Sequence, residues 1–453
     1  MKKTIFLTWT IVASSIAITL FTLGACQPTP TEEAVVNKGD NVFQIAVAST
    51  AKPEQAYSHT DTWSEQYSEG NLTWTFDAKV IMPDSTSFPI IKVTRRPVDK
   101  QILADFISSY VGRADRVYKT VRTVNDIQEE LAAVVKGEVV YNNGELSYIP
   151  FEGQNERIEA LQEELKNTTD VVYIAQDNVD LSARPFQYSY IKADSTVWKI
   201  IATETLLEAT SFNTGILQQE SWVMKGDAYP GEPAGTTIDV SLDQKTAEQF
   251  AVQAAQDIGA SNLAVASIEK ARIIRRYTYE VISAGWMVTL CRNDGGSLPI
   301  DVSRMSFGGA LQYEPSEFMA PWPPETLSVY VDEKGVGWLN WKNPVTAKSV
   351  ENENVQLMPF DQIKEKVKNI IKFGTKWSDN VEQTTINITV QSLTLTNTIM
   401  KVDDSSDYAV LAPTWLIKYV DQNAAGAITI IAINAIDGSR VDPIISMMAV
   451  PPS

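Results

Sequence analysis

The chain has 453 residues, of which 44% are hydrophobic, and it carries a formal net charge of −18. This apolar fraction is ample for packed cores and excludes a disordered protein, and the length suits two or three domains. The negative charge argues against nucleic-acid binding, because phosphate groups would repel the protein.

The N-terminus has the features of an export signal. Two lysines precede a long apolar stretch, and Leu23, Gly24 and Ala25 lie directly before Cys26. A positive start, an apolar core and small residues before a cleavage site are typical of secretory signals, and this end of the stretch resembles the lipobox of bacterial lipoproteins. We therefore expect residues 1–25 to be removed and Cys26 to carry a lipid that anchors the protein on the extracytoplasmic face of the cell membrane. The alternative is an ordinary signal peptide or signal anchor in which Cys26 is incidental.

Residues 26–42 predict a flexible tether between the membrane and the folded body. The segment contains prolines and acids and few large apolar residues, a composition that does not form a packed core. Removal of residues 1–25 takes away two lysines and no acid, so the mature chain carries a net charge of −20. An anionic membrane surface would repel a folded body with this charge, so only the lipid would hold the protein to the membrane.

Five later segments have apolar residues at helical spacing. They are 99–111, 126–136, 155–166, 241–258 and 361–373. Strand-like alternation lies between them, as in Ile386, Ile388 and Val390 with polar residues at the positions between. The patterns predict an α+β fold of antiparallel sheets each covered by helices, with an N-terminal α+β domain at 43–235.

The C-terminal half contains a weak repeat. Each copy has a helix, a strand and a hairpin whose first arm begins at a tryptophan, Trp286 in one copy and Trp415 in the other. In the first copy the chain would return as a strand near Leu298. We therefore predict two related units, at 236–325 and 326–453, and chance similarity between two generic hairpins is the alternative.

The last hairpin allows a more detailed prediction. We expect Trp415 to pack against the helix that begins near Asp361. The strand positions expected to face the same helix are Ile428, Ile430 and Ala432. Thr429, Ile431 and Ile433 form an opposite face that is also largely apolar, so a strand covered on both sides is the alternative.

Several segments resemble known families. Residues 412–415 and 433–439 resemble the terminal hairpin of PepSY-type domains and their relatives in Gram-positive membrane-associated regulators. The resemblance implies that the units at 236–325 and 326–453 are PepSY-like helix-plus-hairpin units. Segments 77–84, 329–341 and 357–363 resemble a family of uncharacterised clostridial lipoproteins. The resemblance implies the fold and the membrane address, and PepSY relatives imply, by analogy, a protein that restrains or regulates a partner.

Few residues of the chain suit catalysis or metal binding. His59 is the single histidine, it lies next to the tether, and no G-x-S-x-G surrounds any serine, so a Ser-His-acid triad is not predicted. One histidine with one cysteine cannot supply a zinc site, and we expect no metal or cofactor. With a lipid on Cys26, Cys291 has no disulfide partner, and its apolar neighbours predict a buried, inert thiol.

An aromatic set marks a candidate partner surface. Trp322, Trp338 and Trp341 could line a platform for a sugar or a peptide, and packing in the core is the alternative. The preferred function is a non-enzymatic lipoprotein that regulates or scaffolds an unknown protein partner of the cell envelope. The alternatives are a solute-binding lipoprotein of an importer and a hydrolase that uses Asp and Glu alone.

Overall fold

The structure is a computed structural model that describes eleven stretches of the chain. They are 57–69, 72–142, 145–169, 171–212, 215–220, 237–275, 281–305, 323–376, 386–400, 408–421 and 427–441. The predicted signal peptide, lipobox and tether lie outside these residues, and so does Trp322. Within the described stretches, no helix is long and apolar enough to cross a membrane.

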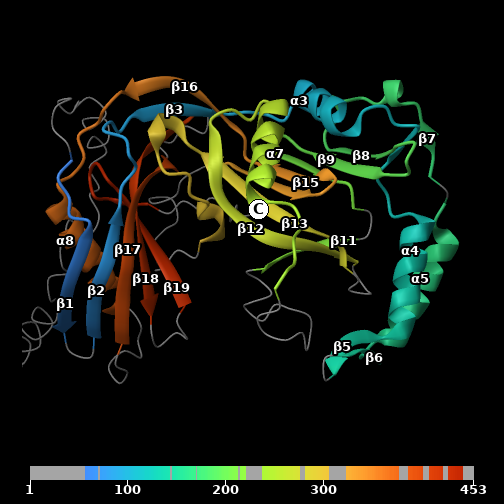
Figure 1. Ribbon diagram of the computed structural model, residues 1–453, viewed down its shortest axis with the longest axis horizontal. Coiled ribbons are helices and arrows are strands. Elements are labelled where there is room, and N and C mark those ends of the chain that lie inside the picture. Colours follow the sequence, from blue (N-terminus) through green and yellow to red (C-terminus); the bar gives the residue numbers. More distant parts are fainter. Residues whose placement is uncertain are drawn as a thin grey trace, which may run out of the picture.

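One of two large sheets has eight strands (Figure 1). Its main path is β1 (Thr62–Glu69), β2 (Leu72–Ile81), β17 (Ile386–Met400), β18 (Ala409–Asp421), β19 (Ala427–Asn434) and β20 (Arg440–Val441). At one end of β18 it adds β3 (Ile90–Arg95), which also pairs with β16 (Val345–Asn352). Neighbouring strands are antiparallel except for β2 and β17, which are parallel.

The second sheet has ten strands, all paired antiparallel. Its order is β11 (Gly215–Gln219), β12 (Leu263–Arg275), β13 (Val281–Arg292), β14 (Thr326–Asp332), β15 (Gly335–Lys342), β10 (Leu206–Thr210), β9 (Val197–Ala202), β8 (Phe186–Ile191), β4 (Arg116–Lys119) and β7 (Tyr173–Ile174). A separate hairpin consists of β5 (Glu138–Asn142) and β6 (Glu145–Ile149).

The described helices agree closely with the periodic segments of the sequence. They are α3 (Lys100–Phe106) with a following π-helical turn (Ile107–Val111), α4 (Val124–Lys136), α5 (Gln154–Asn167), α7 (Gln244–Asp257) and α8 (Phe360–Lys376). Short 3-10 turns occur at Gln176–Asn178, Asp294–Gly296 and Val302–Arg304. Capping hydrogen bonds fix where two of these helices begin. Asp99 accepts hydrogen bonds from backbone amides in the first turn of α3, and Thr123 forms a capping box with Asp126 in α4.

The predicted fold class is wrong. The chain is mostly β, with two large sheets and only a few short helices among the described residues, rather than an α+β fold of antiparallel sheets each covered by helices. The periodic helical segments were easy to detect, whereas the long strands β12 and β18 each begin with a wholly apolar run of four residues in which alternation is lost. Sheet partners also come from distant segments, which a local pattern cannot show.

The sheets draw their strands from across the predicted domains. Strands of 43–235 contribute to both sheets, and β14 and β15 of 326–453 lie beside β13 of 236–325. The predicted return strand near Leu298 is wrong, because β13 pairs with β14 and residues 297–301 have no strand structure.

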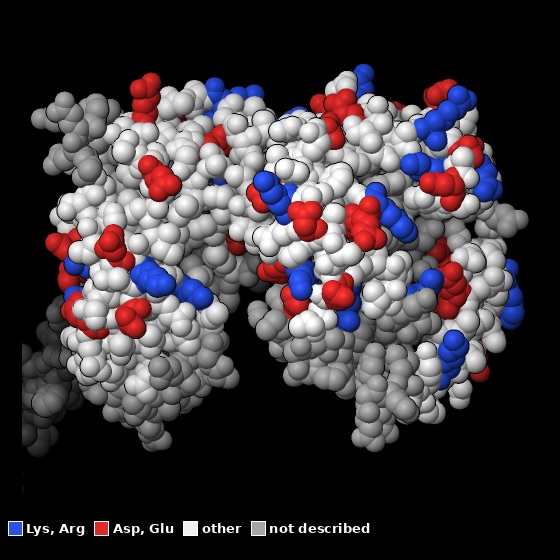
Figure 2. All heavy atoms as spheres, viewed as in Figure 1, with Lys and Arg blue, Asp and Glu red and all other residues white. Residues whose placement is uncertain are grey.

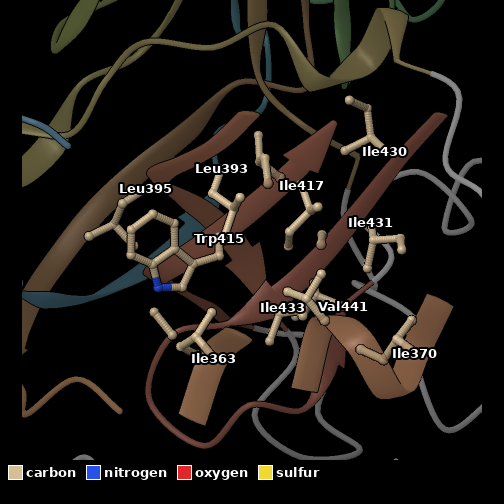
Figure 3. Close-up of a cluster of buried hydrophobic side chains, with 14 of the residues drawn as sticks. Ile363, Ile370, Leu393, Leu395, Trp415, Ile417, Ile430, Ile431, Ile433 and Val441 are labelled. Carbon is tan, nitrogen blue, oxygen red and sulfur yellow. The ribbon is translucent and has the colours of Figure 1, made fainter. Parts of the chain in front are cut away.

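Trp415 lies in the largest hydrophobic core, where α8 meets the eight-stranded sheet (Figure 3). Its side chain is 0% exposed, and its ring centroid lies 5.5 Å from that of Phe360. The predicted packing against this helix is therefore confirmed. The set of strand partners was wrong: Trp415 pairs with Ile433, so Ile431 and Ile433 share its face.

The opposite face of β19 carries the residues that the sequence analysis placed against α8. Ile430 and Ala432 are buried there, and Ile428 is half-exposed. They point away from the Trp415 face because successive side chains alternate along a strand. The strand is therefore covered on both faces over most of its length, as in the alternative interpretation.

Candidate functional site

A buried ionic cluster lies where the two sheets meet. Arg292, the last residue of β13, donates from Nε to Asp294 Oδ2 at 2.5 Å and from Nη1 to Glu325 Oε2 at 3.0 Å. The second Glu325 oxygen, Oε1, accepts a hydrogen bond from Trp341 Nε1 at 2.9 Å. All three charged side chains are at most 9% exposed. One guanidinium therefore balances two carboxylates away from water, an arrangement that stays favourable only while each charge keeps its partners.

Hydrogen bonds connect this cluster to the eight-stranded sheet. Arg292 Nη1 also donates to the carbonyl oxygen of Val345, at the start of β16. Asn397 Nδ2 of β17 donates to the Asp294 carbonyl at 3.1 Å, and Thr396 Oγ1 donates to the Leu298 carbonyl at 2.6 Å. Figure 2 shows the two halves of the molecule in contact on the side of β3 and β16, with a notch between them on the opposite side. The cluster therefore helps to fix how the two sheets are placed.

A small cavity adjoins the cluster. Its volume is about 30 Å³, which is the share of one water molecule in the liquid. Its lining includes Cys291, Arg292, Glu325, Asn397 and Thr398. The rest of the lining is apolar, formed by Ile300, Val302, Pro324, Ile399 and Leu411, and a cavity this small suits ordered water rather than a solute.

The cluster can bind a proton near neutral pH. Burial raises the pKa of Glu325 to about 7, although Arg292 and Trp341 act in the opposite direction. Burial disfavours the charge on Arg292, but Glu325 and Asp294 outweigh it and raise the pKa of the guanidinium. Glu325 is therefore the group of the cluster that changes charge in the physiological range.

Cys291 lies beside this cluster and is buried, as predicted. Burial is the main cause of a raised pKa for its thiol, with smaller contributions from Asp301 and Glu325. Because the thiolate is the reactive form, we expect the native protein to react with a thiol reagent at least about a hundredfold more slowly than the denatured protein. Stopped-flow labelling with a chromogenic disulfide measures both rates, and equal rates would show that the thiol is accessible.

Trp338 and Trp341, the two tryptophans of the predicted surface that the structure describes, do not share a surface. Trp341 is 0% exposed and belongs to the core of the ten-stranded sheet, so its assignment to a partner surface is wrong. Trp338 is half-buried on the other face and donates to Glu208 Oε1 at 3.3 Å. A separation of three residues puts two side chains on opposite faces of a strand. His59 is half-buried beside Tyr57, next to the predicted tether.

A second feature is a projecting arm, which we define as residues 121–169. It contains α4, α5 and the β5–β6 hairpin, and it hangs from the end of the ten-stranded sheet at β4 and β7 (Figure 1). The arm has its own small core, in which Ile127, Val134 and Leu161 are buried. It therefore packs as a unit outside the two main cores.

Ion pairs around the buried Glu130 link the arm helices. Glu130 of α4 is 7% exposed and accepts from both Arg122 and Arg157, the latter bonded through Nε at 3.1 Å. Arg122 Nη1 also contacts Glu164 of α5 at 3.0 Å. Arg157 of α5 therefore pairs with Glu130 of α4, and Arg122, just before α4, contacts both helices.

Exposed apolar side chains concentrate on and beside the arm. Among the described residues, 14 large hydrophobic side chains are exposed, and 6 of them fall within residues 121–173. They are Val121, Val135, Tyr148, Ile149, Val172 and Tyr173. Scattered exposed hydrophobic residues are normal, but four of these six lie on the arm and two directly follow it, so the arm is the candidate interaction surface of the described residues.

The sequence analysis missed both features. Arg292 and Glu325 are 33 positions apart and meet only because β13 and β14 are neighbours. The sequence did contain one indication of the arm: the predicted helix at 155–166 has fewer apolar residues than a helix packed against a main core would need. Such a thin stripe indicates a helix that is covered on one narrow side only.

The described ranges contain no group of three or more His, Cys, Asp or Glu side chains placed to hold a metal ion. No family model and no curated protein matches the chain. A solved structure of an uncharacterized protein from Eubacterium rectale is similar to it, with a TM-score of 0.46 and 11% sequence identity over 88% of this chain and 98% of that chain.

Proposed function

We propose that the protein is a lipoprotein, anchored through Cys26 at the extracytoplasmic face of the cell membrane, whose folded body binds a protein partner of the envelope. The order of residues 23–26 supports the anchor. Residues 26–56 lie between the proposed lipid and the first described residue, Tyr57. The predicted tether, residues 26–42, would have a root-mean-square span of about 20–25 Å as a flexible chain, enough for the body to reach a partner beside it in the envelope.

The arm is the observation that carries the partner-binding role. It is a preformed unit outside the main cores, and it displays apolar side chains that a purely structural appendage would bury. The resemblance of the C-terminal hairpin to PepSY-type domains supports a regulatory role in the same direction.

Cys26→Ala tests the anchor. We expect the variant to accumulate as an unprocessed precursor and to lose all labelling by a radioactive or clickable fatty acid, because the thiol that would carry the lipid is gone. Cys291→Ala is the matched control, and it should be processed and labelled like the wild-type protein. Fatty-acid label on the Cys26→Ala protein would contradict the anchor.

A further inference from the structure

We infer that the arm docks a partner protein whose contact surface combines apolar side chains with lysine or arginine. This inference rests on the proposed partner-binding function and adds the contact surface and its chemistry. The surface has two parts, an apolar tip and an acidic stripe along α5.

The tip is formed where α4 ends and β6 leads into α5. Val135, Tyr148 and Ile149 are 57%, 38% and 45% exposed. Gly137 lets the hairpin close on the helix end, because a Cβ at this position would lie 2.4 Å from the Ile149 carbonyl oxygen. Gln154 Nε2 donates to the Val134 carbonyl at 2.7 Å and so holds the start of α5 at the same place. The three apolar side chains therefore lie at one junction, with Tyr148 and Ile149 on opposite faces of β6 and Lys136 over the Tyr148 ring.

An acidic stripe starts beside this tip. Glu152, Glu156, Glu159 and Glu163 are all exposed. Glu152 lies in the turn before α5, and the spacing of three and four residues puts Glu156, Glu159 and Glu163 on one side of the helix, opposite the buried Leu161. Glu163 also pairs with Lys166 Nζ at 3.0 Å, so the negative charge of the stripe is concentrated at Glu156 and Glu159, near the end of α5 that adjoins the tip.

Charge decides between the partners that an apolar surface could attract. Residues 121–168 contain ten acidic and four basic residues, a net charge of −6. A second copy would bring the same negative charge to the contact, within a chain of net charge −18. Anionic lipid headgroups would be repelled in the same way. A basic and apolar protein surface is complementary to both parts of the arm.

The test uses the full-length, lipidated protein in its native envelope. A photoreactive amino acid replaces Tyr148, and the matched control carries it at Phe250, which is 43% exposed on α7 of the main body. We expect irradiation at position 148 to give one dominant adduct with an envelope protein that is absent from the position 250 control. The captured protein is then purified and its binding to the full chain is measured by surface plasmon resonance.

The chemistry of the contact predicts how variants change that binding. Glu156→Lys, Glu159→Lys and Glu163→Lys combined should lower the association rate about tenfold or more, because the steering charge is reversed. Glu204→Lys, Asp239→Lys and Glu248→Lys combined change the net charge equally at exposed sites off the arm, and they should have a much smaller effect. Tyr148→Ala with Ile149→Ala should weaken affinity about tenfold or more through faster dissociation, and Phe250→Ala should not.

Four results would overturn the inference. They are the absence of a protein adduct at position 148, a dominant adduct with lipid or with a second copy, binding that added salt does not weaken, and equal effects of the two charge-reversal sets. Capture of a partner only from position 250 would leave the proposed interaction function standing and reject the arm as its surface. A wild-type protein that takes up no fatty-acid label would instead reject the anchor and would not affect the inference about the arm.

Discussion

Trp415→Ala is expected to lower the free energy of unfolding by about 3–5 kcal/mol, as for other buried aromatic truncations. The indole is fully buried between the eight-stranded sheet and α8, and Phe360 and Tyr57 contact it from the side. The cavity left by the indole cannot close without moving the helix or the sheet. A loss of this size is a large part of the total stability of an ordinary domain, and urea titration followed by fluorescence and circular dichroism measures it.

Ile428→Ala is the matched control for this substitution. Ile428 lies on the same hairpin but is 50% exposed, so its truncation should change the free energy of unfolding by no more than about 0.5 kcal/mol. A Trp415→Ala protein that unfolds at the same urea concentration as the wild-type protein would contradict the packing of Trp415 in this core.

The sequence predicted the helices well because their signals are local. The stripe at 155–166 corresponds to α5 at Gln154–Asn167, and the stripe at 126–136 corresponds to α4 at Val124–Lys136. A helix buries one stripe whose period can be read from a dozen consecutive residues. The arm could therefore be predicted as two helices, although its projection from the sheet could not.

The arrangement of the strands could not be predicted in the same way. β17 lies parallel to β2, more than three hundred residues earlier in the chain, and β3 joins β16 to β18. Nothing in a short window of sequence encodes such pairings. The face of β19 was misassigned for a related reason, because both faces are apolar and only the pairing of Trp415 with Ile433 shows which of them meets α8.

The buried ionic cluster of Arg292, Asp294 and Glu325 could not be predicted from local sequence either. Neither Arg292 nor Glu325 is part of a motif, and an isolated arginine at a strand end has no special signal. The pairing of β13 with β14 brings the two residues together, and Trp341 arrives from β15 to hold the second carboxylate oxygen. Pairing between strands that are distant in sequence therefore both assembles the ionic cluster and buries its charges.

Arg292→Met is expected to destabilise the protein by about 3–5 kcal/mol at pH 8, because it leaves Asp294 and Glu325 buried without their cation. The linear side chain of methionine retains part of the packing of the arginine stem, so most of the loss reflects the unpaired charges. Arg292→Met combined with Glu325→Gln should recover part of this loss, since it removes one of the two buried carboxylates that lack a cation. A double variant that is less stable than Arg292→Met alone would contradict this account.

The pH dependence of wild-type stability gives an independent test of how the ionic cluster contributes to the free energy of unfolding. The pKa of Glu325 is raised to about 7 in the folded state, above its ordinary value of 4.5. Between these values the folded chain binds more protons than the unfolded chain, so the contribution of Glu325 to stability is present at low pH and falls as the pH rises through about 7. Urea titrations from pH 5 to pH 8 should show this decline, and Glu325→Gln should remove it because glutamine does not titrate. Since a neutral Glu325 needs no cation, the penalty of Arg292→Met should also shrink as the pH is lowered toward 5, and a penalty that stays constant over this range would show that Glu325 remains ionised in the fold.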